Sequence, residues 1–249
     1  MIKLDNVTKT FNRGEANEVT ALKNISLEIK EKEFVVLVGG NGSGKSTILN
    51  AISGNVIANS GKIFLEGTDV TRLKEYKRSK WIARIFQDPH SGTAPDLSIL
   101  ENFRLSSLRT QRKNLFIGTG KKFMQEVKEK ISTLGLGLEN RINRPMNSLS
   151  GGQRQALTLI MAVMSEAKII LLDEPSSALD PKTAALVIKS AEEIIRKYEL
   201  TALLVTHNIK DALLYGNRII QMDDGKIVRD MGADRKNALT AGEVAEWFG

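Results

Sequence analysis

A glycine-rich segment near residue 40 carries the first residues that could do chemistry. It fits the pattern G-x-x-x-x-G-K-S and reads Gly39-Gly40-Asn41-Gly42-Ser43-Gly44-Lys45-Ser46-Thr47. Glycines let consecutive backbone N–H groups converge on phosphate oxygens, and the start of a helix adds partial positive charge. Lys45 is expected to reach the β- and γ-phosphates, and the Ser46 hydroxyl to bind Mg²⁺. The segment therefore predicts a site for a nucleoside triphosphate with its metal ion.

A second candidate site lies where an apolar strand ends in two acids. The run Ile169–Leu172 is followed directly by Asp173 and Glu174. A strand that ends in this way places an acid next to the phosphate-binding loop, where Asp173 is expected to bind Mg²⁺ through water. Glu174 can accept a proton from an attacking water molecule. Apolar runs that end in acids are also common elsewhere, so this interpretation depends on the glycine-rich segment.

A short glycine motif lies between these two sites and reads Leu149-Ser150-Gly151-Gly152-Gln153. Its glycines would expose backbone N–H groups at the start of a helix, which favours an anion. A serine followed by two glycines is also an ordinary helix cap, so only its position between the other motifs makes it specific. With the three motifs in this order, the chain resembles the ATP-binding subunit of an ABC (ATP-binding cassette) transporter, over about residues 1–231.

The resemblance implies that the nucleotide is ATP and that two identical subunits work together. In such proteins Ser150, Gly151 and Gly152 of one subunit close on the γ-phosphate that the other subunit holds. Asp180, at the end of the segment 177–180, matches the loop that crosses between the subunits. ATP would then hold the dimer closed, and hydrolysis would open it.

Other residues match the family one by one. Gln87, after a predicted strand, would sense Mg²⁺ and the attacking water, and its loop would touch the membrane subunit. His207 would contact the γ-phosphate, and Phe11 would stack on adenine, although a core phenylalanine is the alternative there. Two positions depart from the family, which often has proline at Gly40 and aspartate at Asn208. The remaining histidine, His90, matches no motif and is expected to be an exposed loop residue.

The sequence predicts an α/β fold, a P-loop NTPase core with a mostly parallel sheet. An antiparallel β subdomain at the N-terminus and an inserted α-helical subdomain complete it. The expected strands are Ile2–Val7, Ala21–Ile29, Phe34–Val38, Lys62–Glu66, Ile82–Phe86, Ile169–Leu172 and Ala202–Val205, followed by a hairpin over Asn217–Met231 that turns at Asp224-Gly225. The expected helices cover residues 45–54, 123–134, 152–165, 181–198 and 241–248, and one more begins after Ser98 with Glu101 in a capping box.

We expect residues 1–249 to form one ABC ATPase domain. Residues 1–87 and 166–231 would form the nucleotide-binding core, residues 88–165 the helical subdomain, and residues 240–249 a C-terminal helix. The composition agrees with this, since 41% of the residues are hydrophobic and 26% are charged. No apolar run is long enough to cross a membrane, and the N-terminus lacks the apolar core of a secretion signal. The absence of cysteine excludes disulfides and thiolate metal sites.

The net charge of +7 includes a basic stretch with no acid, from Arg104 to Lys122. Such a stretch can be attracted to an anionic membrane surface. It lacks the interleaved aromatic residues that stack on bases, so nucleic acid is not an expected partner. The stretch holds Arg104, Arg109, Arg112, Lys113, Lys121 and Lys122.

We therefore expect an ATP hydrolase at the cytoplasmic face of the cell membrane, bound to transmembrane permease subunits. The segment of residues 87–103, together with the basic stretch, is similar in sequence to the same segment of a group of ATPases. Those ATPases work with branched-chain-amino-acid-type permeases and a substrate-binding lipoprotein. This favours a solute importer, with amino acids among its cargoes. Three alternatives remain open: a soluble cassette without a permease, as in iron–sulfur cluster assembly; a stand-alone exporter or lipoprotein-release ATPase; and a cassette of DNA repair or translation. Cassettes of the last class usually carry a long coiled coil or a second cassette, and this sequence shows neither.

Overall fold

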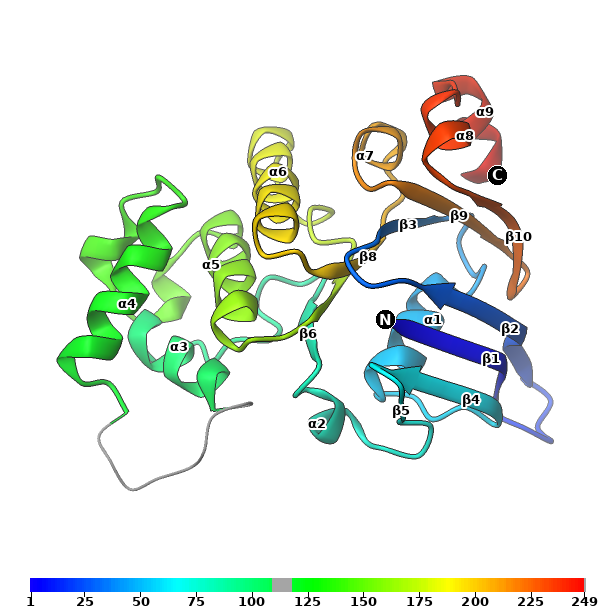
Figure 1. Cartoon of the computed structure of the whole chain (residues 1–249), viewed down its shortest axis with the longest axis horizontal. Helices are drawn as coiled ribbons and strands as arrows, with labels where there is room; N and C mark the ends of the chain where they lie inside the picture. Colours follow the sequence, from blue (N-terminus) through cyan, green and yellow to red (C-terminus); the bar gives the residue numbers. More distant parts are fainter. Residues whose placement is uncertain (109–117, 249) are drawn as a thin grey trace.

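The chain forms two β-sheets surrounded by helices (Figure 1), and the computed structural model describes residues 1–108 and 118–248. The first sheet is antiparallel, in the order β2-β1-β4-β5, and contains β1 (Ile2–Phe11), β2 (Val19–Ile29), β4 (Ser60–Leu65) and β5 (Thr68–Asp69). The second sheet has the order β10-β9-β3-β8-β7-β6. It contains β3 (Phe34–Val38), β6 (Ile82–Ile85), β7 (Ile169–Asp173), β8 (Thr201–Val205), β9 (Arg218–Asp223) and β10 (Lys226–Met231).

The second sheet is parallel except at one edge, where β10 pairs antiparallel with β9. All residues of β3, β7 and β8 are buried, which explains their continuous apolar sequences. Alternate side chains of β3 enter different cores: Val36 packs with the helices on one face, and Val35 packs with the antiparallel sheet and α1 (Lys45–Ser53) on the other. The predicted combination of the two sheets is confirmed.

The predicted helical insertion is also confirmed, and it forms the left lobe of Figure 1. It contains α3 (Ile99–Ser107), α4 (Lys121–Ser132), η1 (Leu138–Arg141), η2 (Met146–Ser148) and α5 (Gly151–Met164). The predicted capping box begins α3, where Glu101 N–H donates to Ser98 Oγ at 3.2 Å. Arg109, Arg112 and Lys113 of the basic stretch lie outside the described residues. The exact boundaries of the core and the insertion stay a prediction.

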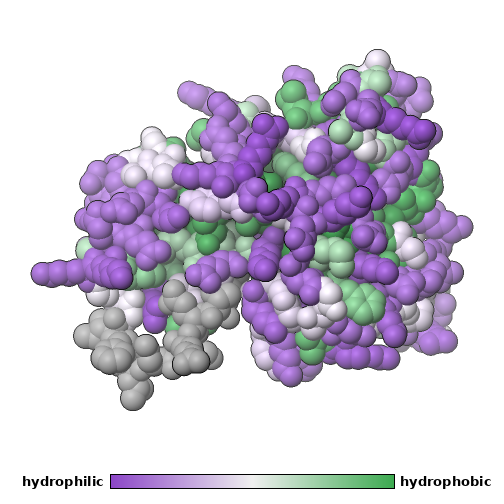
Figure 2. Space-filling model, in the orientation of Figure 1, coloured by the Kyte–Doolittle hydropathy of each residue, from purple (hydrophilic) through white to green (hydrophobic). Residues whose placement is uncertain are grey.

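The remaining helices lie around the sheets: α2 (Glu75–Arg78), α6 (Pro181–Lys197), α7 (Ile209–Leu214), α8 (Ala233–Asn237), α9 (Ala241–Ala245) and the 3₁₀ turn η3 (Glu246–Phe248). The predicted hairpin is confirmed, with positive φ at both Asp224 (43°) and Gly225 (72°), as a type I′ turn requires. In the described ranges, no helix is long and apolar enough to span a membrane. Most of the face in Figure 2 is hydrophilic, and hydrophobic side chains appear there as separate small patches.

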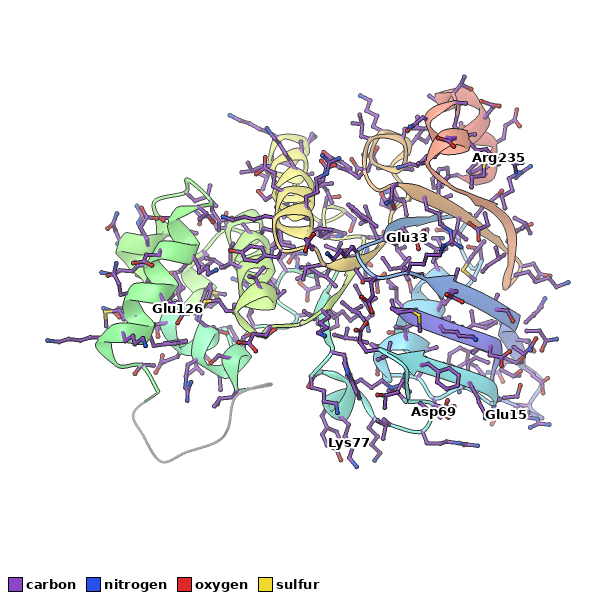
Figure 3. The ribbon with its side chains drawn as sticks, viewed as in Figure 1. Glu15, Glu33, Asp69, Lys77, Glu126 and Arg235 are labelled. Atoms are coloured by element: carbon purple, nitrogen blue, oxygen red, sulfur yellow. The ribbon has the colours of Figure 1, made fainter. Side chains whose placement is uncertain are left out.

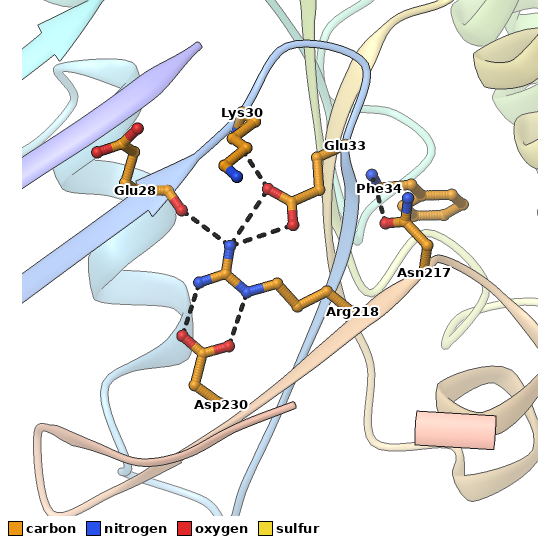
Figure 4. Close-up of polar contacts among 7 residues, drawn as sticks. All are labelled: Glu28, Lys30, Glu33, Phe34, Asn217, Arg218 and Asp230. Carbon is orange, nitrogen blue, oxygen red and sulfur yellow. Dashed lines mark hydrogen bonds and ion pairs between the residues drawn. The ribbon is translucent and has the colours of Figure 1, made fainter. Parts of the chain in front are cut away.

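Arg218 joins the two sheets (Figure 4). From β9 its Nε and Nη2 donate to both oxygens of Asp230 on β10, at 2.7 and 2.6 Å. Its Nη1 donates to the Glu28 carbonyl at the end of β2 at 2.9 Å, and to the Glu33 carboxylate at 3.2 Å. The hydrogen bond to Asp230 is the main reason that the pKa of Arg218 rises above its ordinary value.

Arg78 stabilises the end of α1 from inside the protein. Its side chain is fully buried, and Nη1 donates to the carbonyls of Ala51 and Ile52 at 2.7 and 2.9 Å. Nε and Nη2 donate to Leu73 and Thr71 carbonyls at 2.8 and 3.2 Å. Burial lowers the pKa of Arg78 to about 10, so the guanidinium stays charged at neutral pH. It supplies donors to carbonyls that α1 leaves unpaired at its C-terminus.

We expect Arg78→Met to lower the free energy of unfolding by about 2–4 kcal/mol, because two buried and two partly buried carbonyls lose their donor. Lys77→Met, the same change on the exposed neighbour in α2 (Figure 3), is the control and should stay within about 0.5 kcal/mol of wild type. Urea denaturation of the three proteins measures the difference. Equal midpoints and slopes for the two variants would contradict the role given to Arg78.

Candidate active site

The glycine-rich loop connects β3 to α1, as predicted, and its glycines are needed for its packing. Gly39 has a φ of +144°, and a Cβ there would lie 2.1 Å from the carbonyl oxygen of Met222 in β9. Gly44 has a φ of +101°, and a Cβ there would lie 2.5 Å from the Ala21 carbonyl oxygen in β2. Gly40 faces the C-terminal segment, because a Cβ on it would lie 3.3 Å from the Phe248 carbonyl oxygen. The loop is thus held by both sheets and by η3.

Lys45 lies against the carbonyl oxygens of this loop. Its Nζ donates to Gly39 and Gly40 carbonyls at 2.8 and 2.7 Å. Burial lowers the pKa of Lys45, and the Glu174 and Asp173 carboxylates oppose this effect by raising it. The predicted phosphate-binding loop thus concentrates a buried cation at the end of β3. Of its other members, Asn41, Gly42 and Ser46 are exposed, Ser43 and Gly44 are buried, and Thr47 is half-buried in the first turn of α1.

The structure brings two of the three predicted metal-binding residues, Ser46 and Asp173, side by side. Ser46 Oγ lies 3.4 Å from Asp173 Oδ1, although the two residues are far apart in the sequence. These two oxygen donors fit Mg²⁺, which proteins commonly hold through one or two such ligands while phosphate oxygens and waters complete the shell. No group of three or more His, Cys, Asp or Glu side chains suited to a metal ion occurs within residues 1–108 and 118–248.

Glu174 and His207 also meet, at the neighbouring ends of β7 and β8. His207 Nδ1 lies 3.0 Å from Glu174 Oε2, and because a carboxylate only accepts, the Nδ1 hydrogen is the donor. Glu174 has a positive φ of 46°, and its N–H donates to the Val205 carbonyl of β8 at 3.0 Å. The half-buried carboxylate is thus held by its backbone and side chain together. It can accept a proton from water within reach of Lys45.

The motif 149–153 begins α5, as predicted. Ser150 is the N-cap, Gln153 N–H donates to its hydroxyl at 3.3 Å, and the Gln153 side chain accepts from Ser150 N–H at 3.1 Å. A Cβ on Gly152 would lie 1.9 Å from Thr183 Cγ2, at the start of α6. Asp180 is the N-cap of α6, and its hydrogen bonds with Thr183 lower the pKa of Asp180. The motif and the predicted crossing loop therefore pack together.

Within the part of the chain that the structure describes, no hydrogen bond joins this motif to the loop 39–47. Gly151 instead faces Leu179, whose Cδ2 would lie 3.0 Å from a Cβ on the glycine. The structure thus groups the predicted site residues into two sets within one copy. Lys45, Ser46, Asp173, Glu174 and His207 form the first set, and Ser150, Gly151, Gly152 and Asp180 form the second.

Gln87 and Phe11 lie at the ends of strands. Gln87 is exposed directly after Phe86, which follows β6. Phe11 is half-buried at the end of β1 and pairs with Val19 of β2, two residues before the Ala21 that packs on the loop. This position is compatible with a ring that faces a nucleotide, and it brings Phe11 into no core cluster among the described residues.

Two polar residues that the sequence analysis did not single out, Gln155 and Arg84, connect the elements that carry the site. Gln155 Nε2 donates to the carbonyls of Phe86 and Pro175 at 2.7 and 3.1 Å, connecting α5 with the ends of β6 and β7. Arg84 Nη2 donates to Asp173 Oδ2 at 2.8 Å. The signal for Arg84 was available, because a charged residue stands inside the otherwise apolar strand Ile82–Ile85.

His90 is exposed, as expected, but it has a specific partner. Its Nδ1 lies 2.5 Å from Nη1 of Arg154, a buried residue of α5. Because a guanidinium only donates, His90 accepts this bond through an unprotonated Nδ1. The interaction fastens the segment after Gln87 to the helix that carries the motif 149–153.

We expect Gly39→Ala to destabilise the protein by about 3 kcal/mol and to abolish nucleotide binding, because the Cβ meets the rigid Met222 carbonyl. The matched control is Gly42→Ala, which shares a positive φ (+78°) but has nothing within 4 Å of its Cβ, and should cost about 1–2 kcal/mol. Denaturation and calorimetric titration with ATP would measure both effects. If the two variants lose equal stability, the close approach to β9 is wrong.

Comparison with known proteins agrees with this geometry. Residues 22–177 match the family described as ABC transporter. A tyrosine transport ATP-binding protein of Clostridioides difficile (strain R20291) is 39% identical over 252 residues, covering 100% of this chain and 98% of that protein. The dimeric structure of a post-hydrolysis state of the cassette MJ0796, bound to ADP and Pi, is 34% identical, with a TM-score of 0.80 over 94% of this chain and 99% of that chain. The structure of the ADP conformation of the cassette MJ1267 is 26% identical, with a TM-score of 0.79 over 99% of this chain and 97% of that chain. The fold is therefore that of a P-loop ATP-binding cassette, and the chain belongs to the ABC transporter family as an ATP-hydrolysing subunit.

Proposed function

We propose that this chain powers a solute importer at the cytoplasmic face of the cell membrane, and that its cargo is an amino acid of the aromatic class. The observation that carries this proposal is the similarity over the whole chain to the tyrosine transport ATP-binding protein of Clostridioides difficile. Residues 87–103, which are similar to ATPases of amino-acid importers, support it. The permease and a substrate-binding lipoprotein would select the solute, and this chain would supply the energy.

Hydrolysis in this proposal depends on the first set of residues. Lys45 and the backbone N–H groups of residues 39–47 would bind the phosphates and meet the charge that develops during transfer. Glu174 would orient the attacking water and take its proton, and His207 would hold the carboxylate and contact the γ-phosphate. Ser46 and Asp173 would hold Mg²⁺, with Gln87 as a further contact. The metal ion, when bound, supplies positive charge that neutralises the phosphate oxygens.

The second set of residues would act on ATP in the other copy of a homodimer. Ser150, Gly151 and Gly152 begin a fourteen-residue helix, and a helix start of this kind favours an anion. ATP would bind the closed dimer better than the open one, so its hydrolysis shifts the population towards opening. The permease would use that motion to change the side from which solute has access.

We expect Glu174→Gln to lower the turnover of ATP by about 10²–10⁴-fold, because an amide cannot accept the proton of the attacking water. The variant should keep ATP affinity and accumulate as a dimer in ATP, which size-exclusion chromatography would detect. The control is Glu166→Gln, which changes an exposed glutamate that also has a positive φ (53°, against 46° at Glu174). Normal turnover of the Glu174 variant, or a monomer in saturating ATP, would contradict the proposal.

We place the contact with the permease in a cavity of about 600 Å³ between α1 and α2. Its lining includes Ser53, Tyr76, Arg84 and Phe86, so it lies beside the predicted metal site and the loop of Gln87. Tyr76 is 70% exposed, and an exposed aromatic residue is a typical anchor at a protein interface. A helix of the permease seated here would sense changes in the nucleotide site.

Co-purification in detergent tests the partner. We expect the chain to be retained by a multi-span permease of the amino-acid-importer type that is co-expressed with it, and Tyr76→Asp to lower that retention at least about tenfold by introducing a charge at the interface. Leu214→Asp is the matched control, because Leu214 is also 70% exposed but lies on α7. ATP hydrolysis by the isolated chain should be unchanged in both variants. A chain that binds no permease would support the alternative of a cassette that works without one.

A further inference from the structure

Arg84 lies between the predicted metal site and α1. Its side chain is 9% exposed, and its Nη2 forms an ion pair of 2.8 Å with Asp173 Oδ2. Nη1 donates to Asn50 Oδ1 in α1 at 2.7 Å, and lies 3.5 Å from Ser53 Oγ. The guanidinium carbon lies 4.8 Å from the centre of the Phe86 ring. One side chain thus connects β6, α1, the end of β7 and the segment of Gln87.

These contacts differ from those of a cation that only stabilises the fold. The buried Arg78 satisfies Nε, Nη1 and Nη2 with backbone carbonyls. Arg84, by contrast, keeps a buried Nε without a hydrogen-bond partner among the described residues, although such groups are normally paired. The hydrogen bonds to Asp173 and Asn50 therefore orient the guanidinium in a way that leaves its Nε donor unsatisfied. This favours a role at the carboxylate over simple packing.

The ion pair leaves one Asp173 oxygen for another partner. Arg84 binds Oδ2, whereas Oδ1 lies towards Ser46 Oγ at 3.4 Å. Because the Asp173 side chain is only 13% exposed, an unpaired carboxylate there would be costly. Arg84 compensates that charge, and Lys45 can then stay on the loop carbonyls, where the phosphates are expected. A metal ion that binds through Asp173 would share its carboxylate with the guanidinium.

We propose that Arg84 is a positioning residue that fixes the orientation of Asp173 and weakens the binding of the divalent cation through it. The inference rests on the proposed role of Asp173 in metal binding. With the ion absent, Arg84 keeps Asp173 oriented and neutralised. With the ion present, two positive groups share one carboxylate and repel each other, so the ion is released more easily after hydrolysis. Arg84 thereby trades affinity for turnover.

Binding of Mn²⁺ in the presence of ADP, followed by the EPR signal of free Mn²⁺, tests this without any turnover. We expect the Kd of Mn²⁺ in Arg84→Met to be about tenfold lower than in wild type, because a unit charge next to the carboxylate has been removed. Arg84→Lys keeps that charge and should stay within about twofold of wild type. Arg84→Gln, which removes the charge but keeps a donor for Asp173, should follow the methionine variant and replaces it if that protein does not fold.

Two results would overturn the proposal. An unchanged or higher Kd in Arg84→Met or Arg84→Gln would show that the guanidinium does not compete with the ion. A Kd in Arg84→Lys as low as in the uncharged variants would show that charge is not the cause. The variant Asp173→Asn tests separately whether Asp173 binds the metal ion. If this variant keeps the wild-type Kd for Mn²⁺, Asp173 does not bind the ion, and the proposed roles of Asp173 and Arg84 both fail. If it loses Mn²⁺ while Arg84→Met is unchanged, only the role of Arg84 is wrong.

Discussion

The complete burial of three neighbouring parallel strands is the constraint on which the rest of the structure depends. The residues of β3, β7 and β8 are buried on both faces, so their own sequences can hold almost no polar group. The polar residues of the candidate site therefore stand at the last position of a strand, as Asp173 does in β7, or follow the strand. Since the strands are parallel, the loop after β3, Asp173 with Glu174, and His207 after β8 arrive at one edge. The site is a consequence of the sheet, and no long side chain has to reach across the protein to complete it.

Buried and half-buried arginines connect the elements around this sheet. Arg218 links the two sheets, Arg78 closes the C-terminus of α1, and Arg84 ties α1 to the end of β7. Arg154 reaches from α5 to His90. The planar guanidinium suits this task, because it can serve several acceptors in fixed directions while it stays charged. Their acceptors differ: Arg78 donates to backbone carbonyls, whereas Arg84 donates to the carboxylate of Asp173, a predicted metal ligand.

Much of the fold could be predicted from the sequence, for identifiable reasons. The apolar strands, the glycine-rich loop, the Asp224-Gly225 turn and the capping box at Ser98 all depend on local residue types, and the structure confirms them. β1 and β2 extend further than predicted, to Phe11 and from Val19, because their pairing continues through irregular pairs into residues that are only partly buried in β1 and exposed or partly buried in β2. The short helices α2, α7 and α8 were missed, because a single turn or two leaves no period to detect.

The candidate site, like the fold, could be predicted from the sequence only in part. Its separate motifs could be found because each is a short run of residues, and their roles stay predictions. The pairing of Arg84 with Asp173 could not be predicted, since it depends on β6 lying next to β7 in the sheet order. The same holds for His90 with Arg154, whose contact depends on how the helical insertion packs against the end of β6. Sequence reasoning brought distant segments together where both carried a recognised motif, as with Ser46 and Asp173, and failed for Arg84 and His90, which belong to no motif.

The contact between Gly40 and the last turn of the chain has a consequence for comparing relatives. The Phe248 carbonyl oxygen lies only 3.3 Å from the position of a Cβ on Gly40, so the C-terminal end of the described chain lies directly beside the phosphate loop. A residue with a Cβ at position 40, such as proline, would require η3 to shift slightly. Because a backbone oxygen makes the contact, it constrains the path of the C-terminal segment and not the identity of residue 248, so a chimera that exchanges this segment between relatives should bring the matching loop residue with it.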